Sequence, residues 1–397
     1  MRRLTELTRS ALPESMSRIP SINPERIGWC CSDRGITVSE LSKNLGIDSA
    51  RFAANSLRDE GLTFNQLRKL ATFFSRGVLF FLDTGPVHAN QLHSPQFRTI
   101  TNQKPGLSAK VRSLIGRVER QRELYVSLLE DLGEELPDFE TPNLSGRDIQ
   151  NATIATREWL GLTAENHFEA FRSRVEDRGV LVFRSNGYAG AWQIPSDSTI
   201  SGFSLYDQRC PVVFVRRLLP ESRQTFTLIH ELAHLLLHKK SFIDAEEDLY
   251  SMRGREREAN QFAGLVLVPD DYLSQVHDAS RPHDVSLFDG WLKPFKDQWG
   301  VSGEVILRRL LDTNRLGRTE YDDYRKFILA NSASKAPDSG NRSYRHREPR
   351  HVFGAPFVRA VFDALHTEQI SLSKASTYLD NLKIKDVRAL EEHLANL

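Results

Sequence analysis

Residues 226–240, with the sequence FTLIHELAHLLLHKK, place three histidines and a glutamate in an otherwise apolar stretch. At the helical spacing of about 100° per residue, the polar side chains form one stripe and apolar side chains cover the rest of the surface. A helix that is apolar nearly all round is buried, and burying an uncompensated imidazole or carboxylate costs several kcal/mol. The stripe must therefore be paired, solvated in a cleft or bound to a ligand, as in an active site. Its members are Thr227, His230, Glu231, His234 and His238.

The pattern His-Glu-x-x-His, formed by His230, Glu231 and His234, predicts a metal site. Two imidazoles one helical turn apart can both reach one ion at about 2.0–2.1 Å. Glu231 points to the side of that ion, where it can accept a proton from a water that the ion activates. The alternative is a pair of core histidines that are hydrogen-bonded to their neighbours. A chance match has a probability of roughly a few per cent in such a chain, and the position on a buried helix favours the metal site.

A catalytic zinc needs a third protein ligand and an open fourth position. Residues 254–269 predict a second helix, in which Ala259 and Ala263 are small enough to let the two helices share an ion. Wheel positions put Glu256 closer than Glu258 to the inward face by a modest margin, and the alternative for either is a solvated carboxylate in a first helical turn. The acidic residues downstream of the motif are Glu246, Glu247, Asp248, Glu256 and Glu258.

Four further side chains are candidates for supporting roles. Asn260, one turn after Glu256, could hydrogen-bond a ligating imidazole. His238 could polarise a substrate carbonyl or orient a ligand, although a histidine at a helix end is also favoured by the helix dipole. Tyr206 and Tyr250 are weaker candidates for oxyanion donors.

The elements that must position these residues are helices and short strands. Residues 107–133 predict a long amphipathic helix. Four segments rich in β-branched and aromatic residues predict strands: 179–185, 190–194, 201–207 and 210–217. An exposed sheet edge along 201–207 or 210–217 would let an extended substrate peptide add as a strand.

The two motif segments resemble the ImmA/IrrE metallopeptidases. RQTFTLIHELAHLLLH and EREANQFAGLVLVP match the family pattern Phe-Thr-x-x-His-Glu-x-x-His followed by Glu-x-x-Ala-Asn/Asp-x-Phe-Ala and a proline. The resemblance implies a zincin-like domain, with His230, His234 and Glu256 as metal ligands and Glu231 as the catalytic glutamate. It also implies helix-turn-helix repressors or antitoxin-like proteins as substrates, and a place in transcription regulation and stress response. Arg216 departs from the small polar residue that is frequent in relatives, so substrate preference cannot be carried over.

The expected fold class is α+β, in which a small sheet and active-site helices are flanked by helical units. Residues 1–100 are expected to form a helix-turn-helix-like domain, and 101–150 a connecting amphipathic helix. The zincin-like metallopeptidase domain is expected over 151–329. A polar linker over 330–351 then leads to a C-terminal helical unit at 352–397.

The N-terminal domain supports a second hypothesis, a DNA-binding transcriptional regulator whose metal domain is a sensor or scaffold. Residues 39–46, followed by a helix from about Asp48, have the shape of a helix-turn-helix. The second helix carries Arg51 and Arg58, but it also carries Asp59 and Glu60, and phosphate binding needs a clearer surplus of cations. Docking of a partner protein is therefore favoured over DNA.

Composition limits the remaining options. The chain has 397 residues, enough for about two to four domains, and 53 Lys and Arg against 52 Asp and Glu. No run of about 18 apolar residues is present, so no membrane contact is expected. The N-terminus lacks the apolar core of a signal peptide. Three cysteines with no framework spacing fit a reducing cytoplasm.

The resulting prediction is a cytoplasmic zinc-dependent endopeptidase that cleaves a regulatory protein. Manganese or iron remain alternatives to zinc, because affinity order alone does not decide which ion a site holds.

Overall fold

The structure is a computed structural model that describes residues 18–34, 36–74, 76–85, 103–104, 106–186, 190–217, 220–251, 253–331 and 342–395. The described residues divide into two compact units. The first draws on Met1–Ser94 and Gly106–Ser113, and the second on Pro95–Pro105 and Leu114–Leu397.

The first unit is a small helical domain with a two-stranded ladder. Its apolar side chains form one core that includes Leu41, Leu57 and Leu70. The helices are α1 (Pro24–Arg34), α2 (Val38–Leu45), α3 (Phe64–Phe74) and α4 (Val78–Leu82), and the strands are β1 (Arg18–Ile19) and β2 (Leu62–Thr63).

The helix expected from about Asp48 is instead two short turns, the 3₁₀ segment η2 (Ser49–Phe52) and the π segment η3 (Ser56–Glu60). Asp48 accepts a hydrogen bond from the backbone N–H of Ala50, which stabilises a tight first turn. Ala53 then adopts an extended conformation (φ −62°, ψ 141°), which ends the turn. The prediction that the second helix of the helix-turn-helix is a continuous α-helix is therefore wrong.

The second unit contains a four-stranded sheet in the order β3-β5-β4-β6. Strand β3 is parallel to β5, whereas β4 is antiparallel to both β5 and β6. The strands are β3 (Leu181–Arg184), β4 (Ile200–Leu205), β5 (Val212–Val215) and β6 (Phe242–Ala245).

One predicted strand is absent from this sheet, and one strand of the sheet was not predicted. Residues 190–194 form a turn in place of a strand, because Trp192 is buried against Phe353, with ring centroids 4.8 Å apart, and does not extend the ladder. Strand β6 was not expected, and it joins the sheet beside β4 after the intervening helix. Sheet order therefore depends on pairing between segments that are distant in sequence.

The interior strands β4 and β5 have neighbours on both sides, so the expected substrate edge along 201–207 or 210–217 is wrong for this sheet. Strand β6 is an edge in the part of the chain that is described. The amide of Gln103 covers that edge: Nε2 donates to the Ser241 carbonyl at 2.8 Å, and Oε1 accepts from the Ile243 N–H at 3.3 Å.

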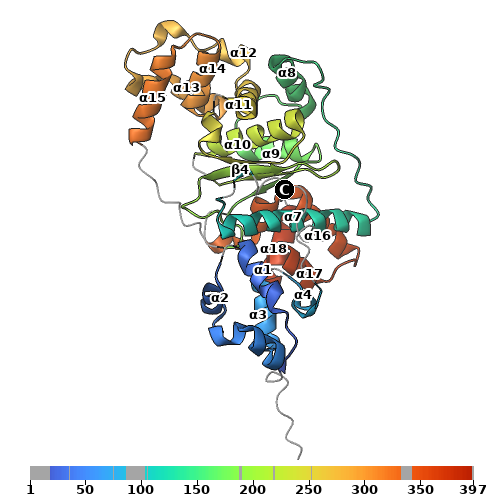
Figure 1. The fold of residues 1–397 in the computed structure, drawn as a ribbon. Coiled ribbons are helices and arrows are strands. Elements are labelled where there is room, and N and C mark those ends of the chain that lie inside the picture. The colour runs from blue at the N-terminus through green and yellow to red at the C-terminus, as the bar shows by residue number, and fades with distance from the viewer. Residues whose placement is uncertain are drawn as a thin grey trace, which may run out of the picture. The chain divides into compact units, whose positions relative to one another are not determined.

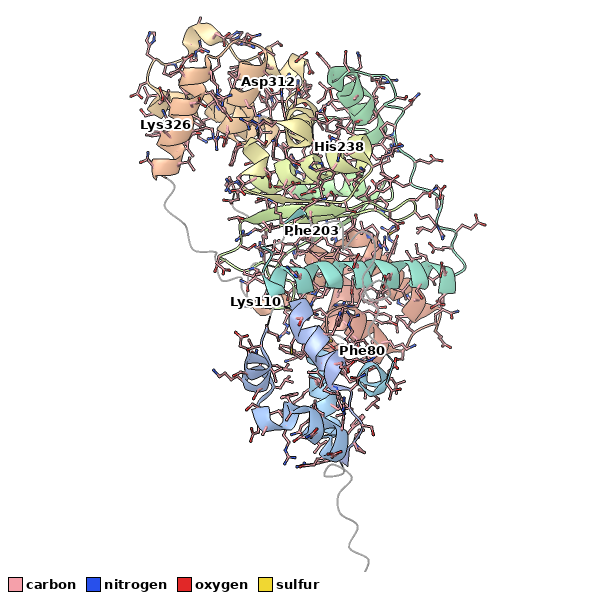
Figure 2. All side chains as sticks on the ribbon, viewed as in Figure 1. Phe80, Lys110, Phe203, His238, Asp312 and Lys326 are labelled. Carbon is pink, nitrogen blue, oxygen red and sulfur yellow. The ribbon has the colours of Figure 1, made fainter. Side chains whose placement is uncertain are left out.

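The two faces of the sheet bury different side chains. Val182 and Val213 belong to the core formed with the helix α10 (Glu221–Ala233). On the opposite face, Phe183 packs against Phe353 of α16 (Glu348–His366), with ring centroids 5.9 Å apart. Figure 1 shows α10 and α16 on opposite sides of the sheet, and Figure 2 labels Phe203 within the sheet layer. This alternation follows from the two-residue period of a strand.

Helix α16 contains a kink at Gly354, where φ is +81°. A Cβ at this position would lie 2.0 Å from Oε1 of Glu176, so the backbone passes directly over that carboxylate. Glu176 also pairs with the Nε of Arg172 at 2.9 Å, and Arg172 donates to the carbonyl of His351 at 3.0 Å. The buried pair thereby ties α9 (Phe168–Glu176) to α16.

The other elements complete a mostly helical, mixed α+β fold, which confirms the expected fold class. No helix in the described ranges is long and apolar enough to cross a membrane. The remaining α-helices are α7 (Ala109–Asp131), α8 (Ile149–Leu160), α11 (Gly254–Leu267), α12 (Asp270–Leu273), α13 (Phe288–Trp299), α14 (Gly303–Asp312), α15 (Arg318–Asn331), α17 (Leu372–Tyr378) and α18 (Ile384–Ala395). The short helical turns are η4 (His234–His238), η5 (Asp248–Tyr250), η6 (Asp278–Ser280), η7 (Val285–Leu287) and η8 (Arg342–Arg347).

Candidate metal centre

Helix α10 carries the polar stripe into the interior of the second unit. Every residue from Gln224 to Ala233 is buried, as the apolar surface of this helix predicts. His230, Glu231 and His234 are each 0% exposed. These three groups are therefore held in a low-dielectric environment, where they need partners.

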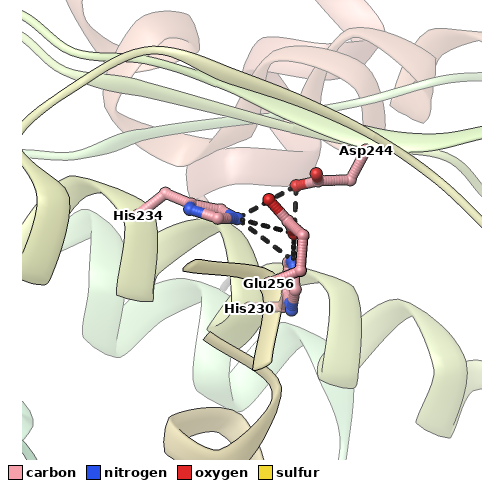
Figure 3. A group of neighbouring side chains, drawn as sticks. All are labelled: His230, His234, Asp244 and Glu256. Atoms are coloured by element: carbon pink, nitrogen blue, oxygen red, sulfur yellow. Dashed lines mark hydrogen bonds and ion pairs between the residues drawn. The ribbon is translucent and has the colours of Figure 1, made fainter. Parts of the chain in front are cut away.

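Four side chains from four elements converge at this point: His230 on α10, His234 at the start of η4, Asp244 on β6 and Glu256 on α11 (Figure 3). The Nε2 atoms of His230 and His234 lie 3.2 Å apart. Oδ2 of Asp244, on β6, lies 3.3 and 3.2 Å from these nitrogens, and Oε2 of Glu256, on α11, lies 3.3 and 3.4 Å from them. All four ligand atoms lie within 4.8 Å of one another.

The chemistry of this donor set fits a divalent cation. Two imidazole nitrogens and two carboxylate oxygens are ligands of zinc, and they also suit iron and manganese. Oδ2 of Asp244 and Oε2 of Glu256 are buried, and no hydrogen bond satisfies either atom. A cation among the four groups would compensate both oxygens.

The electrostatics of the cluster favour positive charge between the two carboxylates. Burial alone would lower the pKa of His230, but contacts with Asp244 and Glu256 raise that pKa to about 9. Burial would raise the pKa of Asp244, yet the two imidazoles hold it well below its ordinary value. The pKa of Glu256 is lowered by the same imidazoles, again against the effect of burial.

Glu231 lies beside the cluster, and neither carboxyl oxygen has a hydrogen-bond partner among the described residues. Burial, reinforced by the negative charge of Asp244, raises its pKa well above the ordinary value. A Cβ at Gly202, on β4, would lie 2.9 Å from Oε1 of Glu231 and 2.7 Å from Cγ2 of Thr227. The lack of a side chain at Gly202 therefore makes room for the glutamate.

The two candidate third ligands take different positions. Glu256 reaches the imidazole pair, whereas Oε2 of Glu258 lies 3.1 Å from Nε2 of His238. His238 in turn places its Nδ1 2.9 Å from Nδ1 of His234, the nitrogen that faces away from the cluster. Burial lowers the pKa of His238. His238 is thus placed to orient His234 rather than to contact a substrate at the cluster.

The other candidate residues lie outside the cluster. Tyr250 accepts a hydrogen bond from Arg223 at 2.6 Å, and the backbone N–H of Tyr206 donates to Ser241 at 2.9 Å. Asn260 donates to the carbonyl oxygens of Asp248 at 2.9 Å and of Ser251 at 3.2 Å, so its amide nitrogen secures the turn before α11 and not an imidazole. Glu246 pairs with Arg223, Asp248 pairs with Lys104, and Glu247 is exposed.

Asp244 is the member of the cluster that sequence reasoning missed. It lies in the apolar run SFIDA, and a carboxylate within a buried strand is a signal of a bound partner. Phe242, two residues earlier on the same face of β6, stacks on the ring of His234 with centroids 4.0 Å apart. Strand β6 therefore contributes both a donor and a packing surface to the cluster.

Arg216, the residue that departs from the family pattern, serves the sheet. Its Nη1 donates to the carbonyl oxygens of Ser198 at 2.5 Å and of Ile200 at 3.3 Å. These contacts brace the chain that enters β4.

Residues 175–311 match the family model of the IrrE N-terminal-like domain, a domain of peptidase family M78. Uncharacterized immunity region protein 2 of Bacillus phage phi105 is 37% identical to this chain over 94 residues. That match spans 23% of this chain and 60% of the phage protein. The resemblance to the ImmA/IrrE family is thereby confirmed for this domain.

Proposed function

Because residues 175–311 carry an IrrE N-terminal-like domain of a peptidase family, we propose that this protein is a metal-dependent endopeptidase that cleaves a regulatory protein. The observation that supports this most directly is the convergence of His230, His234 and Glu256 beside a buried Glu231. We assign the first three as metal ligands and Glu231 as the proton carrier.

His230, His234 and Glu256 would hold the ion, and a zinc ion held there would supply a Lewis acid for a carbonyl and lower the pKa of a bound water to about 7. Manganese and iron remain alternatives, since the cluster includes carboxylate oxygen donors. The imidazoles are buried and pre-oriented, and His238 holds the outer nitrogen of His234. Little reorganisation is therefore needed when the ion binds.

Glu231 performs the proton transfers in this proposal. Glu231 is buried beside the four-residue cluster, and its carboxylate could take a proton from a water that attacks the substrate there. It then delivers that proton to the leaving amine, so the carboxylate is regenerated at the end of the reaction. The missing side chain at Gly202 leaves the space that Oε1 of Glu231 occupies, and Glu231 itself is fully buried.

The substrate we propose is a helix-turn-helix regulator. The support is the ImmA/IrrE resemblance of the motif segments together with the similarity to a phage immunity region protein. The helical first unit is proposed as the docking module for that partner. The sequence has three cysteines without the spacing of a disulfide framework, which supports a reducing compartment such as the cytoplasm.

The alternative, a DNA-binding regulator, has weaker support in the first unit. Arg18 and Arg51 both pair with Glu60, so two of its cations are already engaged. Salt-dependent retardation of DNA by the full chain would favour the alternative.

The test of the proposal is incubation of the purified protein with the helix-turn-helix regulator encoded beside its gene. Cleavage at a single site, detected by mass spectrometry, is expected with metal and is expected to stop on addition of a chelator. The Glu231→Gln variant is the control for a contaminating protease. An intact regulator under all metal conditions would contradict the proposed substrate, and cleavage that resists the chelator would contradict the metal mechanism.

A further inference from the structure

Asp244 occupies a position in the cluster that the proposed mechanism does not use. It lies within β6 and is 2% exposed. In the ladder it pairs with Gly202 next to the irregularity between Ile200 and Gly202. Residues that lie directly opposite each other in an antiparallel pair point to the same face of the sheet. Asp244 is opposite Gly202, so it lies on the sheet face that Glu231 contacts. The fold thus brings a fourth donor to the metal site.

The atom that Asp244 contacts shows what this donor does. A carboxylate that orients a metal-bound histidine pairs with the outer ring nitrogen. Oδ2 of Asp244 instead lies 3.3 and 3.2 Å from the Nε2 atoms of His230 and His234, the same inner nitrogens that Glu256 approaches. Asp244 is therefore placed as a ligand and not as an outer support.

The spacing of the donor atoms agrees with direct ligation. Tetrahedral bonds of about 2.0–2.1 Å require neighbouring donors to be about 3.3–3.4 Å apart. Five of the six distances among the four donors are 3.2, 3.3, 3.2, 3.3 and 3.4 Å, and the sixth, between the two carboxylate oxygens, is no longer than 4.8 Å. Oδ2 of Asp244 lies within 3.3 Å of both Nε2 atoms but accepts no well-aligned hydrogen bond from either, which fits an oxygen that shares an ion with them.

We propose that Asp244 is a fourth protein ligand, which closes the metal centre in this conformation. The inference rests on the metal-binding half of the proposed function. Four protein donors are the number found in closed, structural zinc sites, whereas a catalytic zinc keeps one position for water. With an ion bound, Asp244 would occupy the position that a catalytic water needs, and it would have to leave that position before cleavage.

The first test measures zinc affinity of the full chain by competition with a chromophoric chelator. Asp244→Ala is expected to weaken zinc binding by more than about 100-fold, because loss of an outer support costs only about 10–100-fold. Glu246→Ala is the matched control, since Glu246 follows β6 and pairs with Arg223 outside the cluster. Asp244→Asn, which keeps the shape of the side chain, is expected to weaken binding in the same direction. All three variants are checked for native folding by circular dichroism.

The second test substitutes Co²⁺ and records the visible absorption spectrum, which reports the ligands directly. The spectrum of Asp244→Ala is expected to differ from that of the wild type, while Glu246→Ala leaves it unchanged. With zinc at saturation, Asp244→Ala is expected to cleave at least as fast as the wild type, because a position for water is freed.

The outcomes separate this inference from the proposed function. Unchanged zinc affinity and an unchanged Co²⁺ spectrum in a folded Asp244→Ala protein would overturn the fourth ligand and leave the peptidase proposal intact. Loss of cleavage by Asp244→Ala at full zinc occupancy would overturn the inference that Asp244 competes with water for the ion. A wild-type protein that binds no metal would refute the proposed function itself.

Discussion

Oε1 of Glu231 lies 2.9 Å from the point that a Cβ of residue 202 would occupy. Glu231 on α10 thus packs directly against Gly202 on β4. Strand β5 and its two flanking loops separate the two elements in sequence. A Cβ at position 202 would lie less than 3.0 Å from atoms of Glu231, Thr227 and the Phe214 backbone, so these groups would have to shift.

We therefore expect Gly202→Ala to abolish most cleavage while metal binding is retained. The added methyl group must displace Glu231, and overpacking of this kind costs about 1–3 kcal/mol of folding free energy. Cleavage of the regulator, zinc content and urea unfolding are measured on the same preparation. Gly290→Ala is the control, because a Cβ at Gly290 in α13 meets nothing within 4 Å. Full activity of Gly202→Ala would show that Glu231 does not need the space beside Gly202.

Glu231→Gln is expected to keep its metal and lose cleavage by roughly 10²–10⁴-fold, the usual contribution of a general acid and base. The amide has nearly the same shape as the carboxylate but cannot carry the proton. Elemental analysis and a cleavage assay test the two halves of the prediction. Normal turnover would refute the assigned role.

The variants Glu256→Ala and Glu258→Ala test which glutamate is the third metal ligand. We expect the first to weaken zinc retention strongly, because Oε2 of Glu256 lies 3.3 Å from His230. We expect the second to leave it nearly unchanged, because Glu258 contacts only the outer histidine, His238, in this group. The reverse result would mean that α11 is rotated relative to this structure.

Gly354→Ala is expected to destabilise the second unit by more than Gly179→Ala. Both glycines have φ +81°, a region that costs other residues about 1–2 kcal/mol. Only at Gly354 does a Cβ also collide with a neighbour, 2.0 Å from Oε1 of Glu176, whereas Gly179 has open space. The difference between the free energies of unfolding of the two variants isolates that collision. Equal losses would show that α16 can shift away from Glu176.

Deletion of residues 1–100 is expected to impair cleavage of the folded regulator much more than cleavage of a short peptide that spans its cut site. Docking on the first unit raises the affinity for the whole partner, while the peptide needs only the metal centre. The comparison requires a truncated protein that is folded and loaded with metal. Equal losses on both substrates would argue against docking.

Local pattern was sufficient for the parts of the site that one helix contains. The three- and four-residue spacing of the motif predicts which side chains share a face, and the structure brings His230 and His234 together as that spacing requires. The wheel positions also favoured Glu256 over Glu258, and Glu256 reaches the pair.

The pairing of strands that are distant in sequence could not be predicted from local residue spacing. Asp244 joins the cluster only because β6 pairs with β4, and nothing in the run SFIDA specifies that neighbour. The same pairing makes β4 an interior strand, which is why the expected peptide edge was wrong. Trp192 was expected in a strand because aromatic residues favour strands, but its ring is buried against Phe353.

Helix α16 has a practical consequence for handling the domain that matches the family model. The match to the family model ends at residue 311, yet Phe353 of α16 covers Phe183 and Trp192 with ring centroids 5.9 and 4.8 Å away. A chain cut after residue 331 would expose this aromatic surface to water, and exposed apolar patches promote aggregation. Fragments for expression should therefore extend through α16, or supply that helix as a separate peptide.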